Sequence, residues 1–583
     1  ARDLGVFVLV WGSLMCALLW TPNTPGSLVD YVLFAEFDVQ QGNVVRCQFP
    51  RPVPLCSEPD LAHFMLPDGL HHVTEDSTVF LLREGMLSSC ASTAVVARKT
   101  ASEEAQEDTV DGGERDAPRL LFGLSVACNQ QDLDADRGAS FQALAICCRH
   151  PIPFVFKRLL RHILLDQDPR SSGNGRSPQG ICEVAYNLCN SVDFAGAPSY
   201  SLAEKLVISR CLDISDSGES HFASHVKYGG ETIDLVFPLC LTNSVPSDRS
   251  VSLLRLLQKF EEGIMVILNA ILTERRVLFV GKEGVSAAEV CAMVLASMQM
   301  VVPYYQEAVE TRLFPYLSLD VIECLEVPGY IAGVTNPIFV EQTGWWDVLC
   351  DVGSGKVVIN PKCSQLSKDM DQCREFDAEC YSQALAGVHS HLVRAKGSQS
   401  CENWLRGHFQ DITCELLELC TGSAVFGTPE ARQKAFEVNR HRLDIIQGSK
   451  AFETFLKARD VQLEESPLQV AEVSDALRRL RVRMDLGEEE LLDILDTLVR
   501  NTTNTEQILE VLAMLPESQG GLFRIAMLLY HGNPAIRLQC VILLQQLRSN
   551  KLGQECVRKM NSFMEIGFLR EEAELTAFGA LPS

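Results

Sequence analysis

The first apolar and polar pattern in the chain predicts antiparallel strands. Residues 31–37 are rich in β-branched and aromatic side chains, and the Gln-Gln-Gly-Asn sequence at 40–43 favours a turn before a second strand at 44–49. Three further stretches have the same strand-like composition: residues 78–82, 120–128 and 142–148. Residues 153–165 space their apolar side chains as an amphipathic helix does. We therefore expect residues 28–165 to form a first α/β lobe.

A different pattern follows a Pro-, Ser- and Gly-rich linker at residues 166–180. Residues 253–272 predict one long helix, residues 277–280 an apolar strand, and residues 287–301 another helix. Helix, strand and helix at this spacing are typical of a largely parallel sheet that is covered on both faces. We therefore expect a second α/β lobe over residues 181–360.

Strand patterns fade after this lobe, and apolar residues recur at three- and four-residue spacing. This spacing predicts a helical segment over residues 361–460 and a helical C-terminal region over residues 461–583. The individual predicted helices are residues 405–419, 431–446, 451–458, 491–499, 508–515, 523–530 and 536–547. The last four are short and are compatible with an α-solenoid, although they show no fixed repeat period.

The first 27 residues differ from the rest of the chain. Residues 4–20 carry no charge and are followed by a Thr-Pro-Asn-Thr-Pro-Gly cluster. A helix over this segment would be about 25 Å long, which is short for a hydrocarbon core of about 30 Å. Three interpretations of residues 1–27 stay open: a signal peptide, a membrane anchor, or an artefact of the sequence.

Composition narrows the function classes. A chain of 583 residues, 46% of them hydrophobic, is long enough to form several globular domains. The formal net charge of -25 disfavours nucleic-acid binding, because that affinity rests on clustered Lys and Arg. The 22 cysteines are scattered and form no recurring pair at zinc spacing. We expect no nucleic-acid partner and a reducing compartment.

The sequence contains no motif for side-chain catalysis. Gly353 to Lys356 resembles a phosphate loop but lacks the earlier Gly and the following Ser or Thr, so residues 351–356 are better interpreted as a turn between two strands. The paired histidines at 71–72, and those at 389 and 391, have no further ligands at metal spacing. We expect no catalytic residue, no metal site and no cofactor.

Several short motifs occur in the order found in one known family. In the first lobe they are residues 31–38 (YVLFAEFD), 49–50 (FP), 66–69 (LPDG) and 75–80 (EDSTVF). In the second lobe they are residues 271–281 (ILTERRVLFVG) and 328–339 (PGYIAGVTNPIF). Through these motifs the chain resembles DENN-domain proteins, and most of all their fungal Afi/Mes polarity-axis branch. The resemblance covers residues 28–360 well and continues more weakly to residue 459.

The resemblance implies a two-lobed DENN module, with a longin-like lobe and a mostly parallel α/β lobe, followed by an all-α C-terminal region. It implies a guanine-nucleotide exchange factor for a Rab-type GTPase in vesicle traffic or cell polarity. Such exchange requires tighter binding of the nucleotide-free GTPase and no acid, base or nucleophile. The alternative is a non-catalytic docking scaffold for an Arf-type GTPase. Either function implies a cytoplasmic protein that is peripheral on membranes through its partner.

Three polar residues are candidate contacts in the cleft expected between the lobes. Glu274 and Arg275 precede the central strand, and Asn336 follows the next strand. Each has a structural alternative, because Arg after a helix often caps its carbonyls and Asn before Pro favours turns. A third function class, a secreted or anchored protein with disulfides, applies if residues 4–20 are a genuine leader.

Overall fold

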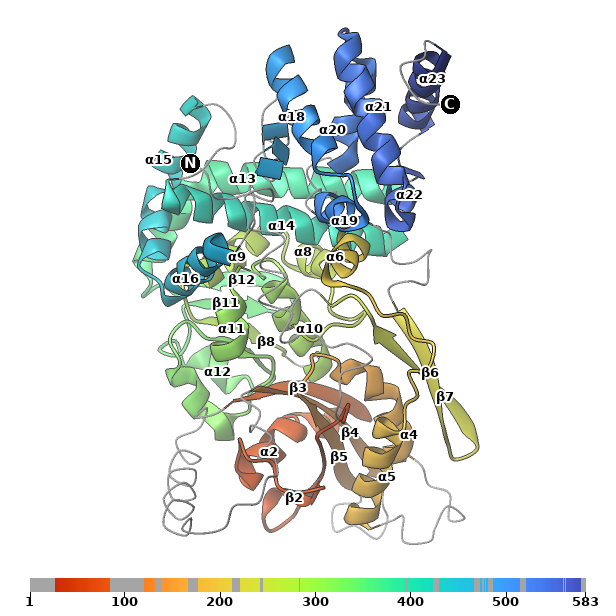
Figure 1. Cartoon of the computed structure of the whole chain (residues 1–583). Helices are drawn as coiled ribbons and strands as arrows, with labels where there is room; N and C mark the ends of the chain where they lie inside the picture. Colours follow the sequence, from red (N-terminus) through yellow and green to blue (C-terminus); the bar gives the residue numbers. More distant parts are fainter. Residues whose placement is uncertain are drawn as a thin grey trace, which may run out of the picture.

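A computed structural model of the chain has a mixed α/β part and a helical C-terminal region (Figure 1). The described residues are 27–83, 120–131, 139–165, 177–211, 221–241, 245–393, 397–422, 429–465 and 472–577, with short interior gaps at 283, 303, 474–475, 478, 481–485, 514–520, 559 and 561. The apolar segment at 4–20 and most of the expected linker lie outside them. Within the described ranges, no helix combines the length and hydropathy needed to cross a bilayer.

The first sheet is antiparallel throughout, with strand order β2-β1-β5-β4-β3. Its strands are β1 (Tyr31–Asp38), β2 (Gly42–Phe49), β3 (Glu75–Arg83), β4 (Leu120–Gln131) and β5 (Ala139–Cys148). Successive side chains alternate between its faces, so Val32 packs with helices α4 (Lys157–Leu165) and α5 (Pro178–Asn190), whereas Leu33 packs with α2 (Glu58–Met65). The strands predicted for the first lobe are confirmed.

The first part of the chain also contains two 3-10 helices and an α-helix that begins within the expected linker. The 3-10 helix η1 (Leu70–His72) follows α2, and the 3-10 helix η2 (Pro153–Phe156) directly precedes α4. Helix α5 begins inside the expected linker, where Ser177 caps it and Pro178 occupies its first turn. It packs against β1 and β2, so this segment belongs physically to the first sheet.

The second sheet is mostly parallel, as predicted, with strand order β12-β11-β8-β10-β9. Its strands are β8 (Val277–Val280), β9 (Leu313–Phe314), β10 (Ile331–Val334), β11 (Val348–Asp351) and β12 (Lys356–Ile359). Only β12 runs antiparallel, in the hairpin expected around residues 351–356. The helices around this sheet are α8 (Leu253–Phe260), α9 (Gly263–Leu272), α10 (Ala287–Met298), α11 (Gln306–Thr311), η5 (Leu319–Glu326) and α12 (Ile338–Glu341).

The prediction of one helix over residues 253–272 was wrong, because the chain breaks into α8 and α9. Glu261 adopts a positive φ of 48°, which interrupts helical hydrogen bonding, and α9 starts two residues later at Gly263. A Cβ atom at Gly263 would lie 2.6 Å from a methyl of Val357, so the chain passes close to β12 here. Apolar spacing continues across the break and hides it.

The two sheets share one apolar core. Tyr31 and Phe80 from the first sheet belong to the same buried cluster as Leu278 and Val280 of β8. Helix α10 lies between β3 and β10 and contacts both. The interface between the two lobes is therefore closed by packed side chains.

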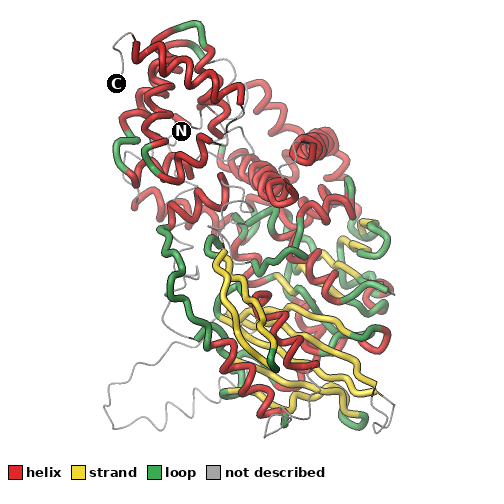
Figure 2. Tube along the Cα trace, turned by 90° about the vertical axis from the view of Figure 1, so that its right-hand side faces the viewer, coloured by secondary structure: helices red, strands yellow, loops and turns green. Residues whose placement is uncertain are grey.

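Helices form the other end of the molecule, opposite the first sheet (Figure 2). A first tier contains α13 (Ser364–Val393), α14 (Gly397–Thr421), α15 (Pro429–Gln447) and α16 (Lys450–Glu465). The C-terminal region contains α18 (Glu488–Arg500), α19 (Thr505–Ala513), α20 (Gly521–Met527), η7 (Leu528–Tyr530), α21 (Pro534–Arg548), α22 (Lys551–Arg558) and α23 (Ser562–Ala577). The helices predicted there are confirmed as helical, except that residues 514–515 of the predicted helix at 508–515 lie outside the described residues.

One helix from the middle of the chain completes the C-terminal core. Helix α6 (Leu202–Cys211) packs against α19 and α22 and buries Val207 and Ile208 among their apolar residues. The hairpin of β6 (His221–Tyr228) and β7 (Glu231–Pro238) follows it and lies along α4 (Figure 1). The C-terminal core thus depends on a segment from between the two sheets.

Candidate partner-binding site

The loop after α2 is fixed to the second lobe by two hydrogen bonds of the Asp68 main chain, and their two partners lie within hydrogen-bonding distance of each other. The backbone N–H of Asp68 donates to the Tyr316 hydroxyl at 2.7 Å, and the Thr335 hydroxyl donates to the Asp68 carbonyl at 3.0 Å. The Tyr316 and Thr335 hydroxyls lie 3.2 Å apart. Because Thr335 directly follows β10, the carboxyl end of that strand meets the first lobe here.

Asn336, one of the three predicted contacts, belongs to this junction. Its amide nitrogen lies 3.4 Å from the Asp68 carboxylate, and its side-chain oxygen accepts from the Ile338 N–H at 3.1 Å. Burial raises the pKa of Asp68, the hydrogen bond from Asn336 opposes this rise, and the nearby Asp320 carboxylate adds to it. Asn336 therefore stabilises the turn before α12, which was its structural alternative, and also contacts the first lobe through Asp68.

Exposed apolar side chains flank this junction. Ile322 of η5 is 42% exposed and Ile338 of α12 is 43% exposed. The His63 imidazole of α2 lies 3.1 Å from the Asp320 carboxylate of η5, which brings the two lobes together at the surface. We call His63, Asp68, Asp320, Ile322 and Ile338 the seam surface. The two isoleucines offer apolar area that a protein partner could contact.

Two further charged residues tie the first sheet to the second lobe. The Asp76 carboxylate accepts from the N–H groups of Ala287 and Ala288, at 2.8 and 3.0 Å, and so caps the N-terminus of α10. The buried Arg83 guanidinium donates to backbone carbonyls at the end of α11, including that of Thr311 at 2.9 Å. Both contacts hold the first sheet against the second lobe.

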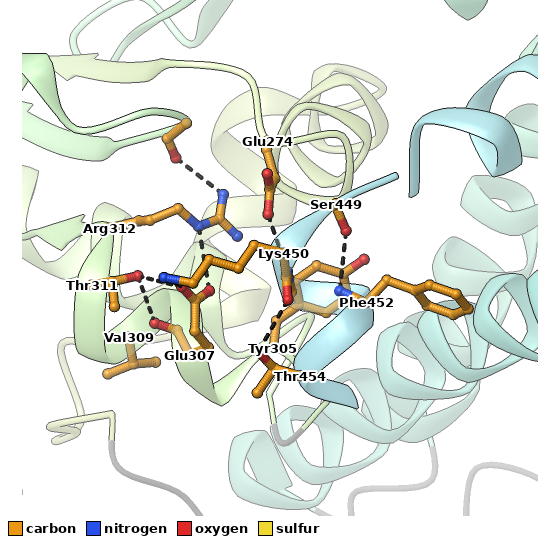
Figure 3. A network of polar contacts seen from close by, with 12 residues as sticks. Glu274, Tyr305, Glu307, Val309, Thr311, Arg312, Ser449, Lys450, Phe452 and Thr454 are labelled. Carbon is orange, nitrogen blue, oxygen red and sulfur yellow. Dashed lines mark hydrogen bonds and ion pairs between the residues drawn. The ribbon is translucent and has the colours of Figure 1, made fainter. Parts of the chain in front are cut away.

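Glu274 and Arg275 lie elsewhere. Glu274 has a positive φ of 52°, and its carboxylate accepts from the Ala451 N–H at 3.3 Å, at the start of α16 (Figure 3). The backbone N–H of Arg275 bonds to the Ala270 carbonyl at 2.8 Å and closes α9. Arg275 therefore caps a carbonyl of α9, as the structural alternative expects, and it does so through its backbone N–H.

A network of polar residues surrounds Glu274 (Figure 3). Glu307 of α11 accepts from the Thr311 hydroxyl at 2.9 Å and lies 3.9 Å from both Lys450 and Arg312. Arg312 also donates to the Gly329 carbonyl at 3.1 Å. The charged residues of this network, Glu307, Arg312 and Lys450, were not identified from the sequence, because they are distant from Glu274 in the chain. The network holds the start of α16 against the second lobe.

The structure does not bring the three predicted contacts into one site. Strands β8 and β10 are parallel and aligned, with Val277 opposite Ile331 and Val280 opposite Val334. Glu274 precedes β8, whereas Asn336 follows β10, so they lie at opposite ends of the sheet. At about 3.3 Å per residue, the length of the strands alone separates these ends by about 10 Å. Among the described residues, no group of three His, Cys, Asp or Glu side chains is placed to hold a metal ion.

Two family models match this chain. Residues 31–135 match a model described as the docking domain of Afi1 for Arf3 in vesicle trafficking, and residues 250–361 match one described as stabilization of polarity axis. The chain is also similar to an AFI1-like protein of Schizosaccharomyces pombe, with 25% identity over 388 residues. The match covers 57% of this chain and 59% of that relative, so it spans about three fifths of the relative's length.

The two matched segments correspond to the two sheets. The first begins with β1 and extends past β4, and the second extends from just before α8 to just after β12. The seam surface contains residues from both: His63 and Asp68 from the first, and Asp320, Ile322 and Ile338 from the second. The matches support the Afi1 and polarity-axis branch of the resemblance.

Proposed function

We propose that this chain is a docking factor for an Arf-type small GTPase in vesicle traffic or cell polarity. The observation that carries this proposal is the match of residues 31–135 to a docking domain for Arf3. These residues include most of the first antiparallel sheet and the helix α2 that borders the seam surface. Docking requires a stable, complementary surface and no reactive side chain, which agrees with the absence of catalytic motifs in the sequence.

The seam surface is the site at which we propose that the GTPase binds. Residues of both matched segments meet here, with the His63 imidazole 3.1 Å from the Asp320 carboxylate, and the exposed isoleucines offer apolar contact area. The polar contacts between the first sheet and the second lobe keep these two parts in one relative position, which lowers the entropic cost of binding. A GTPase bound here would hold the chain at the membrane as a peripheral partner.

Nucleotide exchange on a Rab-type GTPase stays a prediction from the resemblance, as do the DENN module and the longin-like character of the first lobe. Two α/β sheets that share a core are compatible with such a module. The descriptions of the matched models name an Arf GTPase and no Rab, so docking is the function that we place first.

The test combines binding and exchange on the full chain. Immobilised Arf and Rab GTPases, each loaded with GDP or a non-hydrolysable GTP analogue, are titrated with the chain, and release of fluorescent GDP is followed in parallel. We expect binding to a GTP-loaded Arf without faster GDP release. Fast GDP release from a Rab would favour the exchange prediction, and binding to no Arf would refute the docking proposal.

A matched pair of variants tests the location. Ile322→Ser with Ile338→Ser should weaken Arf binding by at least about tenfold, because apolar anchors at an interface centre carry most of the affinity. The control, Val236→Ser with Leu385→Ser, removes side chains of 49% and 45% exposure far from the seam surface and should leave binding unchanged. Equal binding by both variants would move the site elsewhere.

A further inference from the structure

The C-terminal region carries the densest group of exposed apolar side chains in the described part of the chain. Phe523 and Met527 of α20 are 50% and 44% exposed, and Phe563, Ile566 and Leu569 of α23 are 61%, 65% and 51% exposed. We call these five residues the end face. Their spacing of three or four residues places them along one side of each helix.

The two helices hold the end face as one rigid surface. Helix α20 contacts α23, and Tyr530, just after α20, stacks on Phe563 with ring centroids 4.5 Å apart. The Tyr530 hydroxyl donates to the Phe563 carbonyl at 2.6 Å. A Cβ atom at Gly567 would lie 2.4 Å from that hydroxyl, so glycine permits this close approach.

Helix α23 is apolar on two sides. One side buries Met564 and Phe568 in the C-terminal core, and the other presents Phe563, Ile566 and Leu569 to solvent. A helix that is apolar on more than one face is normally covered on each of them. Half-exposed side chains of this size give the end face roughly 500 Å² of apolar surface, which is the size of the largest apolar patches on soluble monomers, and those patches are often functional.

The charges beside the end face indicate the chemistry of what covers it. Glu565 and Glu574 are exposed on α23, and the Glu574 carboxylate is close enough to Arg570 to contribute to the raised pKa of that guanidinium. The Arg570 guanidinium is already engaged, 2.9 Å from the Glu571 carboxylate and above the Tyr530 ring. On α23, the carboxylates of Glu565, Glu571, Glu572 and Glu574 outnumber the one guanidinium of Arg570, so this helix gives the rim an acidic side. A second copy of a chain with net charge -25 would be repelled, whereas a basic partner would be attracted.

We propose that the end face docks an amphipathic helix of another protein, with apolar residues at i, i+3, i+4 and i+7 and Lys or Arg on both flanks. Large exposed side chains on two contacting helices offer apolar area to the apolar side of a partner helix. Neither family model reaches this region, which lies beyond residue 361. The interaction is independent of GTPase docking at the seam surface.

The test uses model peptides and the full chain. A fluorescent Leu/Lys amphipathic helix of about 18 residues is compared with a Leu/Glu helix of the same apolar pattern. Ile566→Ser with Leu569→Ser removes two exposed residues and leaves the Phe563–Tyr530 stack in place. We expect this variant to bind the Leu/Lys helix at least about tenfold more weakly, with Val236→Ser/Leu385→Ser unchanged.

Reversing the charge of two glutamates tests how much of the peptide binding is electrostatic. Glu565→Lys with Glu574→Lys should weaken the Leu/Lys helix and strengthen the Leu/Glu helix, while its circular dichroism stays that of the parent chain. Equal Leu/Lys binding by the parent and the Ile566→Ser/Leu569→Ser variant would overturn the proposal. So would a dimer in sedimentation that this variant abolishes, or vesicle binding that it abolishes without any effect on the peptide.

Discussion

Two regions of the molecule are stabilised in different ways. In residues 27–465 without α6, which we call the α/β region, two sheets and the first helical tier are interlocked through clusters that mix distant segments. In residues 472–577 together with α6, which we call the C-terminal region, short helices surround a separate apolar core. The difference indicates that the C-terminal region can lose stability without loss of the α/β region.

Polar ties sharpen the comparison. In the α/β region, the Glu402 carboxylate of α14 accepts from the Leu253 N–H at 2.9 Å at the start of α8. The Arg442 guanidinium lies 2.9 Å from the Asp377 carboxylate, with both side chains almost fully buried. Several ion pairs of the C-terminal region are exposed instead, for example Arg500 with Asp496, and contribute little. Buried hydrogen bonds and ion pairs fix the packing of the α/β region. The C-terminal region is held mainly by apolar packing, and its end face stays exposed.

The largest expected effect comes from breaking the buried ion pair. Arg442→Met leaves Asp377 buried without its counterion and should lower the free energy of unfolding of the α/β region by about 3–5 kcal/mol. Burial already raises the pKa of Asp377, and Arg442 opposes this rise. In the variant the raised carboxyl pKa means that stability returns as the pH falls, because the folded state then binds the proton more tightly. Urea unfolding at several pH values measures both effects.

The double variant is the control for this experiment. Arg442→Met with Asp377→Asn removes the uncompensated charge and should recover most of the lost stability. The amide can still accept the hydrogen bond that the Asn269 side chain donates to Asp377 at 2.7 Å. A double variant as unstable as the single one would mean that the pair is not the tie we describe.

The next effect tests whether the two regions unfold separately. Ile208→Ala creates a cavity in the C-terminal core and should destabilise that region by about 2–4 kcal/mol. Trp345, Trp346 and Trp404 lie in the α/β region, and residues 472–577 contain no tryptophan. Fluorescence should therefore keep its midpoint while the far-ultraviolet circular dichroism loses helix earlier.

Its matched control is a buried isoleucine of the other region. Ile267→Ala in α9 should shift the fluorescence midpoint, since Ile267 is fully buried in the α/β core. If Ile208→Ala moves fluorescence and circular dichroism together, the two regions unfold as one unit and the comparison fails.

Much of the fold follows from local patterns. Strands of the first sheet have β-branched and aromatic residues, and the parallel sheet follows from its helix and strand spacing. The β6–β7 hairpin also had a usable signal, because Gly229 and Gly230, with φ values of 56° and 81°, join two alternating strands. The break at Glu261 had a weak signal, in two charged residues followed by Gly263.

The candidate site could be predicted only in part. Asn336 was identified from its place after a strand, but its partner Asp68 lies 268 residues away in sequence. Glu274 was identified too, yet its partner is a backbone N–H at the start of α16. Strand-end positions therefore find single residues, whereas tertiary packing decides which of them meet.

The smallest expected effect concerns the carboxylate of Asp68 at the seam surface, which we compare with the buried carboxylate of Asp377. The raised pKa of Asp68 comes mainly from burial, so its ionised form weakens the fold, and this penalty is present above the folded pKa and disappears as the pH falls. Asp68→Asn keeps the acceptor for Asn336 and should stabilise the chain at neutral pH by at most about 1 kcal/mol. The gain should shrink toward pH 4, and urea unfolding of the parent chain and the variant between pH 4 and pH 7 measures it. A loss of stability at neutral pH would mean that the carboxylate itself ties the lobes, as Asp377 does in the interior.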